Sequence, residues 1–392
     1  MNVFYKNGTH IIIDRIHILC DPTFTTGNSE LNYEEYVSKR QINAKKKIRA
    51  YERAELLIVS HAHADHCDHI GYFRDRQIPC IAHQMTYVLK KNQMPFYDNM
   101  IFMDTTSKNK VKYKHLVIEA FSSGHCGGAL MFRITGKEGV VGFTGDINMA
   151  FSFTIPPASP LLGCDTLIIE ANFGDPQYEF ADAMGEYRKL KDFCTAKFND
   201  GYRAVAMYGQ ALGKNQNVAN FLSRLTFQYN VDGDVREKPP TILMGDYTYR
   251  QTEIYNQYYV QKCEPIQNES TFEQLILPRC TVLLYSFMRC KLDDIAALER
   301  RYGLSQQEDY ELPIAIISGF KGEHVSDIFT CYPNAATIEL SSHCDFTQLL
   351  QFIEKSSPKR VCAFHGSSDV FAKELRERGY EAYDIHTETY IS

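Results

Sequence analysis

Three histidines and one aspartate lie within six residues of the chain, in the segment Ser60-His-Ala-His-Ala-Asp-His66. The apolar run 56–60 directly before them predicts a short buried strand, so the histidines follow its carboxyl end. Crowded imidazoles repel one another when protonated, whereas neutral imidazole and carboxylate are the ligands that catalytic zinc takes. His61 and His63 can point the same way, and Asp65 and His66 can face a second metal. A surface accident is the competing interpretation, and the preceding strand disfavours it.

This arrangement resembles the HxHxDH signature of the metallo-β-lactamase superfamily. The other elements of that family's site occur in the family's order. They are Asp21 at the end of Ile-Leu-Cys-Asp, His125 in Ser-Gly-His-Cys-Gly-Gly, Asp146 in Val-Gly-Phe-Thr-Gly-Asp, and His365 in Ala-Phe-His-Gly. Each element alone is weak, but five in order over most of the chain are specific.

More than two hundred residues separate Asp146 from His365, which exceeds what a plain hydrolase of this superfamily needs. Glu170 in Leu-Ile-Ile-Glu-Ala-Asn-Phe-Gly-Asp resembles the "ESTYGD"-like strand end of the β-CASP nucleases. His343 in Ser-His-Cys-Asp resembles their "SAHxD" motif. The resemblance therefore implies an α/β fold, a metallo-β-lactamase αββα sandwich with an inserted parallel α/β β-CASP cap.

The sequence pattern agrees with an insertion. After Pro176, buried runs at 204–208, 241–244, 282–286 and 314–318 alternate with stretches of helical periodicity, which is typical of a parallel α/β domain. We expect residues 1–176 to form the first part of the metallo-β-lactamase domain. Residues 177–335 would form the cap, and residues 336–392 the C-terminal return.

The resemblance implies a two-zinc site with seven ligands. The first ion would be held by His61, His63 and His125, the second by Asp65, His66 and His365, and Asp146 would bridge them. Two neighbouring metal ions can activate a water and neutralise the non-bridging oxygens of a phosphodiester.

The resemblance also assigns roles around the metals. His343 would give a proton to the leaving oxygen, and Glu170 would orient that imidazole. Asp21 would orient ligand histidines from outside, and with Asp65 it completes the set of catalytic candidates. The alternatives are a scaffold role for His343 and a turn-capping role for Glu170.

The leading hypothesis is a zinc-dependent ribonuclease acting on single-stranded RNA, because His365 stands where RNA-directed members carry histidine. A DNA exonuclease of the ligase-associated branch is the nearest alternative, since its members can keep that histidine. A small-molecule hydrolase and a non-catalytic scaffold are less favoured, because of the insertion and the complete ligand set. Asn172, Gln210 and Ser367 depart from the family's usual residues, which leaves substrate details open.

Composition sets wider limits. The 44% hydrophobic and 23% charged residues are typical of a soluble globular protein, and a net charge of −6 argues against a protein that coats nucleic acid. Basic residues between Lys39 and Arg53 could contact phosphates, although a solvated helical face explains them better. No apolar run approaches a membrane span and no signal peptide is evident, so we expect a cytoplasmic protein without a membrane partner. A homodimer is left open.

The twelve cysteines are expected to be reduced. None forms a CxxC pair with metal-ligand spacing. Cys67, Cys126 and Cys344 each follow a motif histidine, and we interpret them as small packing residues beside the site.

Overall fold

The computed structural model describes residues 1–23, 53–70, 73, 76–90, 99–231, 233–273, 276–287, 298–302, 312–319, 334–388 and 390–391. The basic stretch 39–49 lies outside these residues. The chain divides into two compact units. Unit 1 comprises residues 1–149, 157–179 and 343–392, and unit 2 comprises residues 150–156 and 180–342. The assignment of named domains with boundaries at 176 and 335 stays a prediction.

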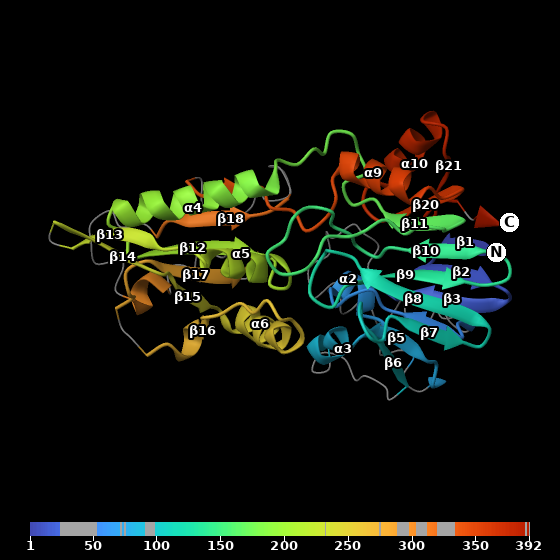
Figure 1. The fold of residues 1–392 in the computed structure, drawn as a ribbon, viewed down its shortest axis with the longest axis horizontal. Coiled ribbons are helices and arrows are strands. Elements are labelled where there is room, and N and C mark those ends of the chain that lie inside the picture. The colour runs from blue at the N-terminus through green and yellow to red at the C-terminus, as the bar shows by residue number, and fades with distance from the viewer. Residues whose placement is uncertain are drawn as a thin grey trace. The chain divides into compact units, whose positions relative to one another are not determined.

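Two sheets form the centre of unit 1 (Figure 1). In spatial order, the described strands of the first are β22 (Tyr390–Ile391), β1 (Asn2–Tyr5), β2 (Thr9–Ile13), β3 (Ile16–Cys20), β4 (Leu56–Ile58), β5 (Cys80–His83) and β6 (Met100–Met103). Those of the second are β21 (Glu381–Asp384), β20 (Arg360–Phe364), β11 (Thr166–Glu170), β10 (Val140–Phe143), β9 (Leu130–Thr135), β8 (Leu116–Ser122) and β7 (Lys110–Tyr113).

Helices cover the outer faces of these sheets. They are α2 (Ala64–Cys67) and α3 (Gln84–Lys90) on the first, and α9 (Phe346–Ser356) and α10 (Ser368–Glu377) on the second (Figure 1). One apolar cluster joins the inner faces of both sheets, with Ile18 and Ile58 from the first and Phe132 and Phe364 from the second. The predicted αββα sandwich is confirmed.

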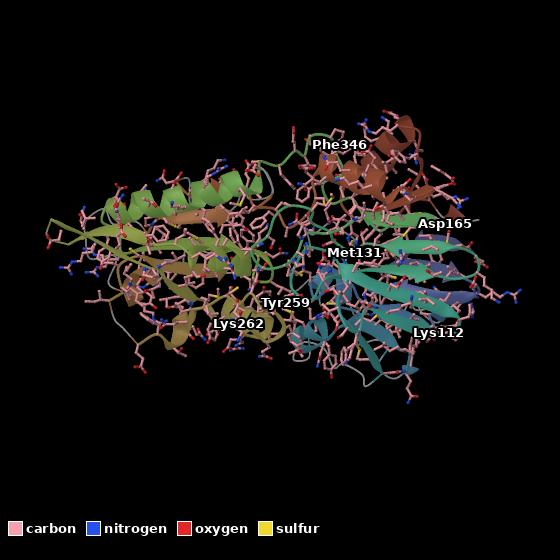
Figure 2. All side chains as sticks on the ribbon, viewed as in Figure 1. Lys112, Met131, Asp165, Tyr259, Lys262 and Phe346 are labelled. Atoms are coloured by element: carbon pink, nitrogen blue, oxygen red, sulfur yellow. The ribbon has the colours of Figure 1, made fainter. Side chains whose placement is uncertain are left out.

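A second apolar layer lies between the second sheet and its helices. Met131 of β9 and Phe346 of α9, both labelled in Figure 2, belong to it. Helix α9 begins after Asp345, whose side chain caps it by accepting a hydrogen bond from the backbone N–H of Gln348 at 2.8 Å. Its inward residues Leu349, Phe352 and Ile353 are fully buried. This packing fixes the start of the helix, three residues after His343.

Unit 2 is built on a parallel sheet. In spatial order, its described strands are β16 (Gln267–Asn268), β15 (Thr241–Met244), β17 (Thr281–Ser286), β12 (Ala204–Gly209), β18 (Ile314–Ile317) and β19 (Ala336–Ile338). Its helices are α4 (Ala183–Asn199), α5 (Lys214–Leu222), α6 (Asp246–Tyr258) and the 3-10 turn η3 (Glu269–Thr271). Strands β13 (Phe227–Val231) and β14 (Asp234–Lys238) form a separate hairpin.

Strand and helix alternation in unit 2 follows the sequence pattern, and all described pairings within its main sheet are parallel. The predicted parallel α/β character is confirmed. None of the helices in the described part of the chain combines the length and the apolar composition that a bilayer crossing requires.

Candidate metal centre

The candidate site lies in unit 1, where strand ends from both sheets meet. His61, His63 and His66 follow β4 of the first sheet, whereas His125, Asp146 and His365 follow β8, β10 and β20 of the second. Residues at strand ends are held by the sheet, so distant parts of the chain present side chains at fixed positions.

Two groups of metal-binding atoms converge there. One contains His61, His63, His125 and Asp146, and the other contains His66, Asp146 and His365; within each group the donor atoms lie within 4.8 Å of one another. Asp146 belongs to both. Its Oδ2 lies 3.6 Å from Nε2 of both His61 and His125, and 3.2 Å from Nε2 of His66. Six of the seven predicted ligands therefore come together, with Asp146 shared between the groups.

Asp65, the seventh predicted ligand, stands apart. Its side chain is 59% exposed, and its Oδ2 lies 3.6 Å from His66 Nε2. Asp65 belongs to neither group in the described structure. Its position beside His66 keeps its predicted role as a ligand open to test.

The geometry of the first group fits a cation better than it fits hydrogen bonds. His63 Nδ1 lies 3.0 Å from Nε2 of both His61 and His125. One proton on His63 Nδ1 can serve only one of these neighbours. Zinc with nitrogen ligands at about 2.0–2.1 Å in a tetrahedron holds those nitrogens about 3.3 Å apart. Three imidazole nitrogens this close together therefore suit a metal ion.

The electrostatics agree. Burial, followed by the neighbouring imidazoles, holds the pKa of His61 well below its ordinary value. Burial also lowers the pKa of His63 and of His365 to about 4. These imidazoles are thus neutral near pH 7, which is the form that binds metals. The residues present fit a metal site.

The second group lies among carboxylates, whose negative charge favours a cation. Burial alone would lower the pKa of His66, but the carboxylates of Asp146, Asp65 and Asp21 outweigh it and raise that pKa well above its ordinary value. Burial would likewise raise the pKa of Asp146, but His66 and His343 outweigh it and hold that pKa well below the usual range. The site therefore favours positive charge between its carboxylates.

Asp21 controls which imidazole nitrogens face the site. His66 Nδ1 lies 2.8 Å from Asp21 Oδ2, so its N–H donates to that carboxylate and Nε2 turns toward Asp146. The Ser60 hydroxyl also donates to Asp21 Oδ2 at 2.6 Å, and Ser60 Oγ lies 2.9 Å from His61 Nδ1. His61 consequently donates from Nδ1 to Ser60 and leaves Nε2 for a ligand. The sequence reasoning predicted Asp21 in this role but missed Ser60.

His365 is held by its backbone. Its φ is 62°, in the left-handed region, and its N–H donates to His386 Nε2 at 3.0 Å. Gly366 follows with φ 50°, and a Cβ there would lie 2.4 Å from the Cα of Asn172. Only glycine fits this turn. His386 was also missed, because its contact is to backbone and leaves no motif.

A third group of donors contains Asp146, Glu170 and His343. His343 Nδ1 lies 3.1 Å and 3.3 Å from the two carboxylate oxygens of Glu170. Glu170 is fully buried, and its Oε1 accepts the backbone N–H of Ile147 at 2.8 Å. Its Oε2 accepts the side-chain amide of Asn172 at 2.6 Å. Both oxygens are thus occupied by N–H donors, so the carboxylate orients His343 rather than binding a metal.

Asn172 connects this pair to the metal donors. Its amide nitrogen also lies 3.3 Å from Asp146 Oδ1. The departure from the family's usual residue at this position therefore places an amide donor between two buried carboxylates. Sequence reasoning recognised the departure but not the contact.

The cysteines beside the motif histidines are packed inside. Cys67, Cys126 and Cys344 are at most 1% exposed. Burial raises the pKa of the Cys67 thiol to about 12, and it also raises the pKa values of Cys126 and Cys344 well above their ordinary value. They are thiols near pH 7, which agrees with packing residues.

Comparisons with known proteins agree with this geometry. Residues 333–387 match the family model described as a Zn-dependent metallo-hydrolase RNA specificity domain. The chain is 23% identical over 203 residues to the RNase J-like protein of Methanocaldococcus jannaschii, covering 47% of this chain and 46% of that protein. It is 24% identical over 213 residues to RNase aCSPSF2 of Saccharolobus solfataricus, covering 46% and 41%.

Over these parts of its length, the chain is similar to β-CASP nucleases of the metallo-β-lactamase superfamily. The chain also shares 24% identity over 282 residues with a probable DNA ligase of Opitutus terrae, covering 67% of the chain and 23% of that protein. It spans less than half the length of these curated relatives. A crystal structure of a protein of unknown function from Enterococcus faecalis has the same fold, with a TM-score of 0.60 and 14% identity over the full chain.

Proposed function

We propose that this chain is a zinc-dependent ribonuclease that hydrolyses phosphodiester bonds in single-stranded RNA. The observation that carries the proposal is the sharing of Asp146 between two groups of metal donors, directly beside the His343–Glu170 pair. We assign His61, His63 and His125 to one zinc ion, His66, His365 and Asp65 to a second, and Asp146 to both. Bound there, two zinc ions would lower the pKa of water and neutralise charge on the scissile phosphate.

The chain's own residues would handle the protons. Because His343 directs Nδ1 to Glu170, its Nε2 is the nitrogen left to protonate the leaving oxygen. Glu170 fixes the orientation of that imidazole and favours its charged form. Asn172 holds Glu170 in place through its 2.6 Å hydrogen bond. Asp21 fixes His66 and, through Ser60, His61.

RNA is preferred as substrate for two reasons. The matched family model is described as an RNA specificity domain, and it includes His365. Two of the curated relatives are named as RNase proteins. A cytoplasmic location and a homodimer stay predictions.

A DNA exonuclease is the second candidate. The match to the probable DNA ligase covers 67% of this chain, which is more than the RNase relatives cover. An activity associated with DNA joining would explain that similarity.

One experiment separates these proposals. The purified protein is incubated with end-labelled RNA and DNA oligonucleotides of the same sequence, and bound zinc is measured per chain. We expect two zinc ions and cleavage of RNA, with the fragment ladder showing whether cutting starts at an end. Cleavage of DNA alone would replace the RNA assignment with the second candidate. Less than one zinc ion per chain, with cleavage of neither the RNA nor the DNA oligonucleotide, would instead indicate a non-catalytic scaffold.

A further inference from the structure

Unit 2 contains a cavity of about 290 Å³ at the carboxyl edge of its parallel sheet. Its walls come from the ends of four neighbouring strands: Tyr208 of β12, Gly245 after β15, Glu269 after β16, and Tyr285 of β17. The proposed reaction uses none of these residues. The cavity is near the lower limit of about 300 Å³ for pockets that hold small molecules.

The location is one at which doubly wound sheets bind ligands. From β12 the chain crosses the sheet to β15 in one direction, and from β17 it crosses to β18 in the other. Where the crossing direction reverses, the loops beyond the carboxyl ends separate and leave a crevice. The cavity lies beyond these strand ends.

One wall of the cavity is held in place by charge. Glu269 is 7% exposed, and its Oε1 accepts hydrogen bonds from Arg301 at 2.7 Å and from the Tyr302 hydroxyl at 2.6 Å. Arg301 also donates to the backbone carbonyl of Ser270 at 3.2 Å. These contacts fix the η3 turn before any ligand arrives, as a preformed site requires.

Tyr285 supplies an unused polar group. The residue is 8% exposed, and its hydroxyl has no hydrogen-bond partner in the described part of the chain. Its ring stacks on that of Tyr208, with centroids 5.7 Å apart, and a Cβ at Gly245 would approach it to 2.6 Å. The ring therefore cannot turn to seek a partner. A buried hydroxyl without one is costly, and a ligand in the cavity would satisfy it.

We propose that this cavity binds a ribonucleoside. The Tyr285 hydroxyl would bond to a polar edge of the base, and the 44% exposed ring of Tyr247 would stack on its face. Asp246, which accepts a hydrogen bond from Ser270, would accept the sugar hydroxyls. Carboxylates take this part in other nucleotide-binding parallel sheets. The proposal does not depend on the reaction proposed for unit 1.

The test is a calorimetric titration of the purified protein with adenosine, guanosine, cytidine and uridine. We expect at least one to bind saturably with a Kd below about 1 mM. Tyr285→Phe should weaken that binding about tenfold through loss of one hydrogen bond. Tyr187→Phe, which removes another buried tyrosine hydroxyl of unit 2 outside the cavity, should leave it unchanged. Asp246→Asn, at an exposed position, should weaken ribonucleosides more than their 2′-deoxy forms.

Saturable binding to none of the four nucleosides would overturn the proposal. Binding that neither Tyr285→Phe nor Asp246→Asn weakens would overturn it as well, because the nucleoside would then lie elsewhere. A single-stranded RNA oligonucleotide distinguishes the source of the ligand. If the oligonucleotide displaces the nucleoside, the natural ligand of the cavity is a nucleotide within an RNA strand. If it does not, the natural ligand is a free nucleoside.

Discussion

His343→Ala removes the imidazole to which we assign protonation of the leaving oxygen. Glu170 holds this imidazole at 3.1 Å, and the side chain is 17% exposed, so substrate can reach it. A positioned general acid contributes about 10²–10⁴-fold to rate. We expect RNA cleavage to fall at least about a hundredfold, which corresponds to about 2.7 kcal/mol of activation free energy. Zinc content should not change, because His343 belongs to neither of the two metal groups.

The substrate's leaving group makes this prediction selective. Single-turnover rates are measured for an RNA oligonucleotide and for a nucleoside p-nitrophenyl phosphate, whose leaving group departs without a proton. His343→Ala should slow the first strongly and the second little. His115→Ala is the matched control, since His115 pairs with Asp14 at 3.1 Å, and it should change neither rate. Equal losses on both substrates in His343→Ala would show that His343 does not act as the acid.

Three further changes test other parts of the structure. His63→Ala should abolish cleavage and reduce bound zinc, measured by atomic absorption; full zinc content would contradict its assignment as a ligand. Burial lowers the pKa of His10 to about 4. Its protonation therefore opposes folding as pH falls below about 6.5, by up to about 3 kcal/mol at pH 4. Denaturant unfolding should show that His10→Gln loses less stability than the unmodified protein between about pH 6.5 and pH 4. An identical pH dependence in the two proteins would refute this account of His10. Gly366→Ala should destabilise the fold by more than Gly379→Ala, because both have positive φ but only Gly366 is crowded, by Asn172. Equal unfolding midpoints would contradict this difference.

The sequence predicted the central strands of both units because their residues are buried on both faces. β4, β11 and β12 are continuous buried runs, and each was expected within a residue or two of its bounds. The edge strand β7 and the separate β13–β14 hairpin were not predicted. β7 alternates between exposed and half-buried residues, and the β13–β14 hairpin carries mostly polar side chains. Their pairing depends on neighbouring strands rather than on their own hydrophobicity.

The residues of the candidate site likewise fall into those that the sequence predicted and those that it did not. His61, His125, Asp146 and Glu170 could be predicted because each follows a buried strand in a recognisable motif. Ser60 and His386 could not, since they act by contacting other polar groups rather than by chemistry of their own. His386 lies 21 residues beyond His365 and accepts a backbone N–H, a contact that only the β20–β21 pairing creates. The orientation of the proposed ligands is thus a property of the fold.

Each of the two sheets of unit 1 contributes its own set of site residues, and each set is positioned by one pairing between neighbouring strands. His61 and His66 depend on the parallel pairing of β3 with β4, which brings Asp21 to Ser60 and to His66. Glu170 and His365 depend on the parallel pairing of β11 with β20. The apolar layer between the sheets holds these two sets together. A substitution in that apolar layer would therefore change the distance between the site residues of the two sheets without altering either set. A substitution of Asp21 would instead disorder the site residues of the first sheet and leave those of the second in place.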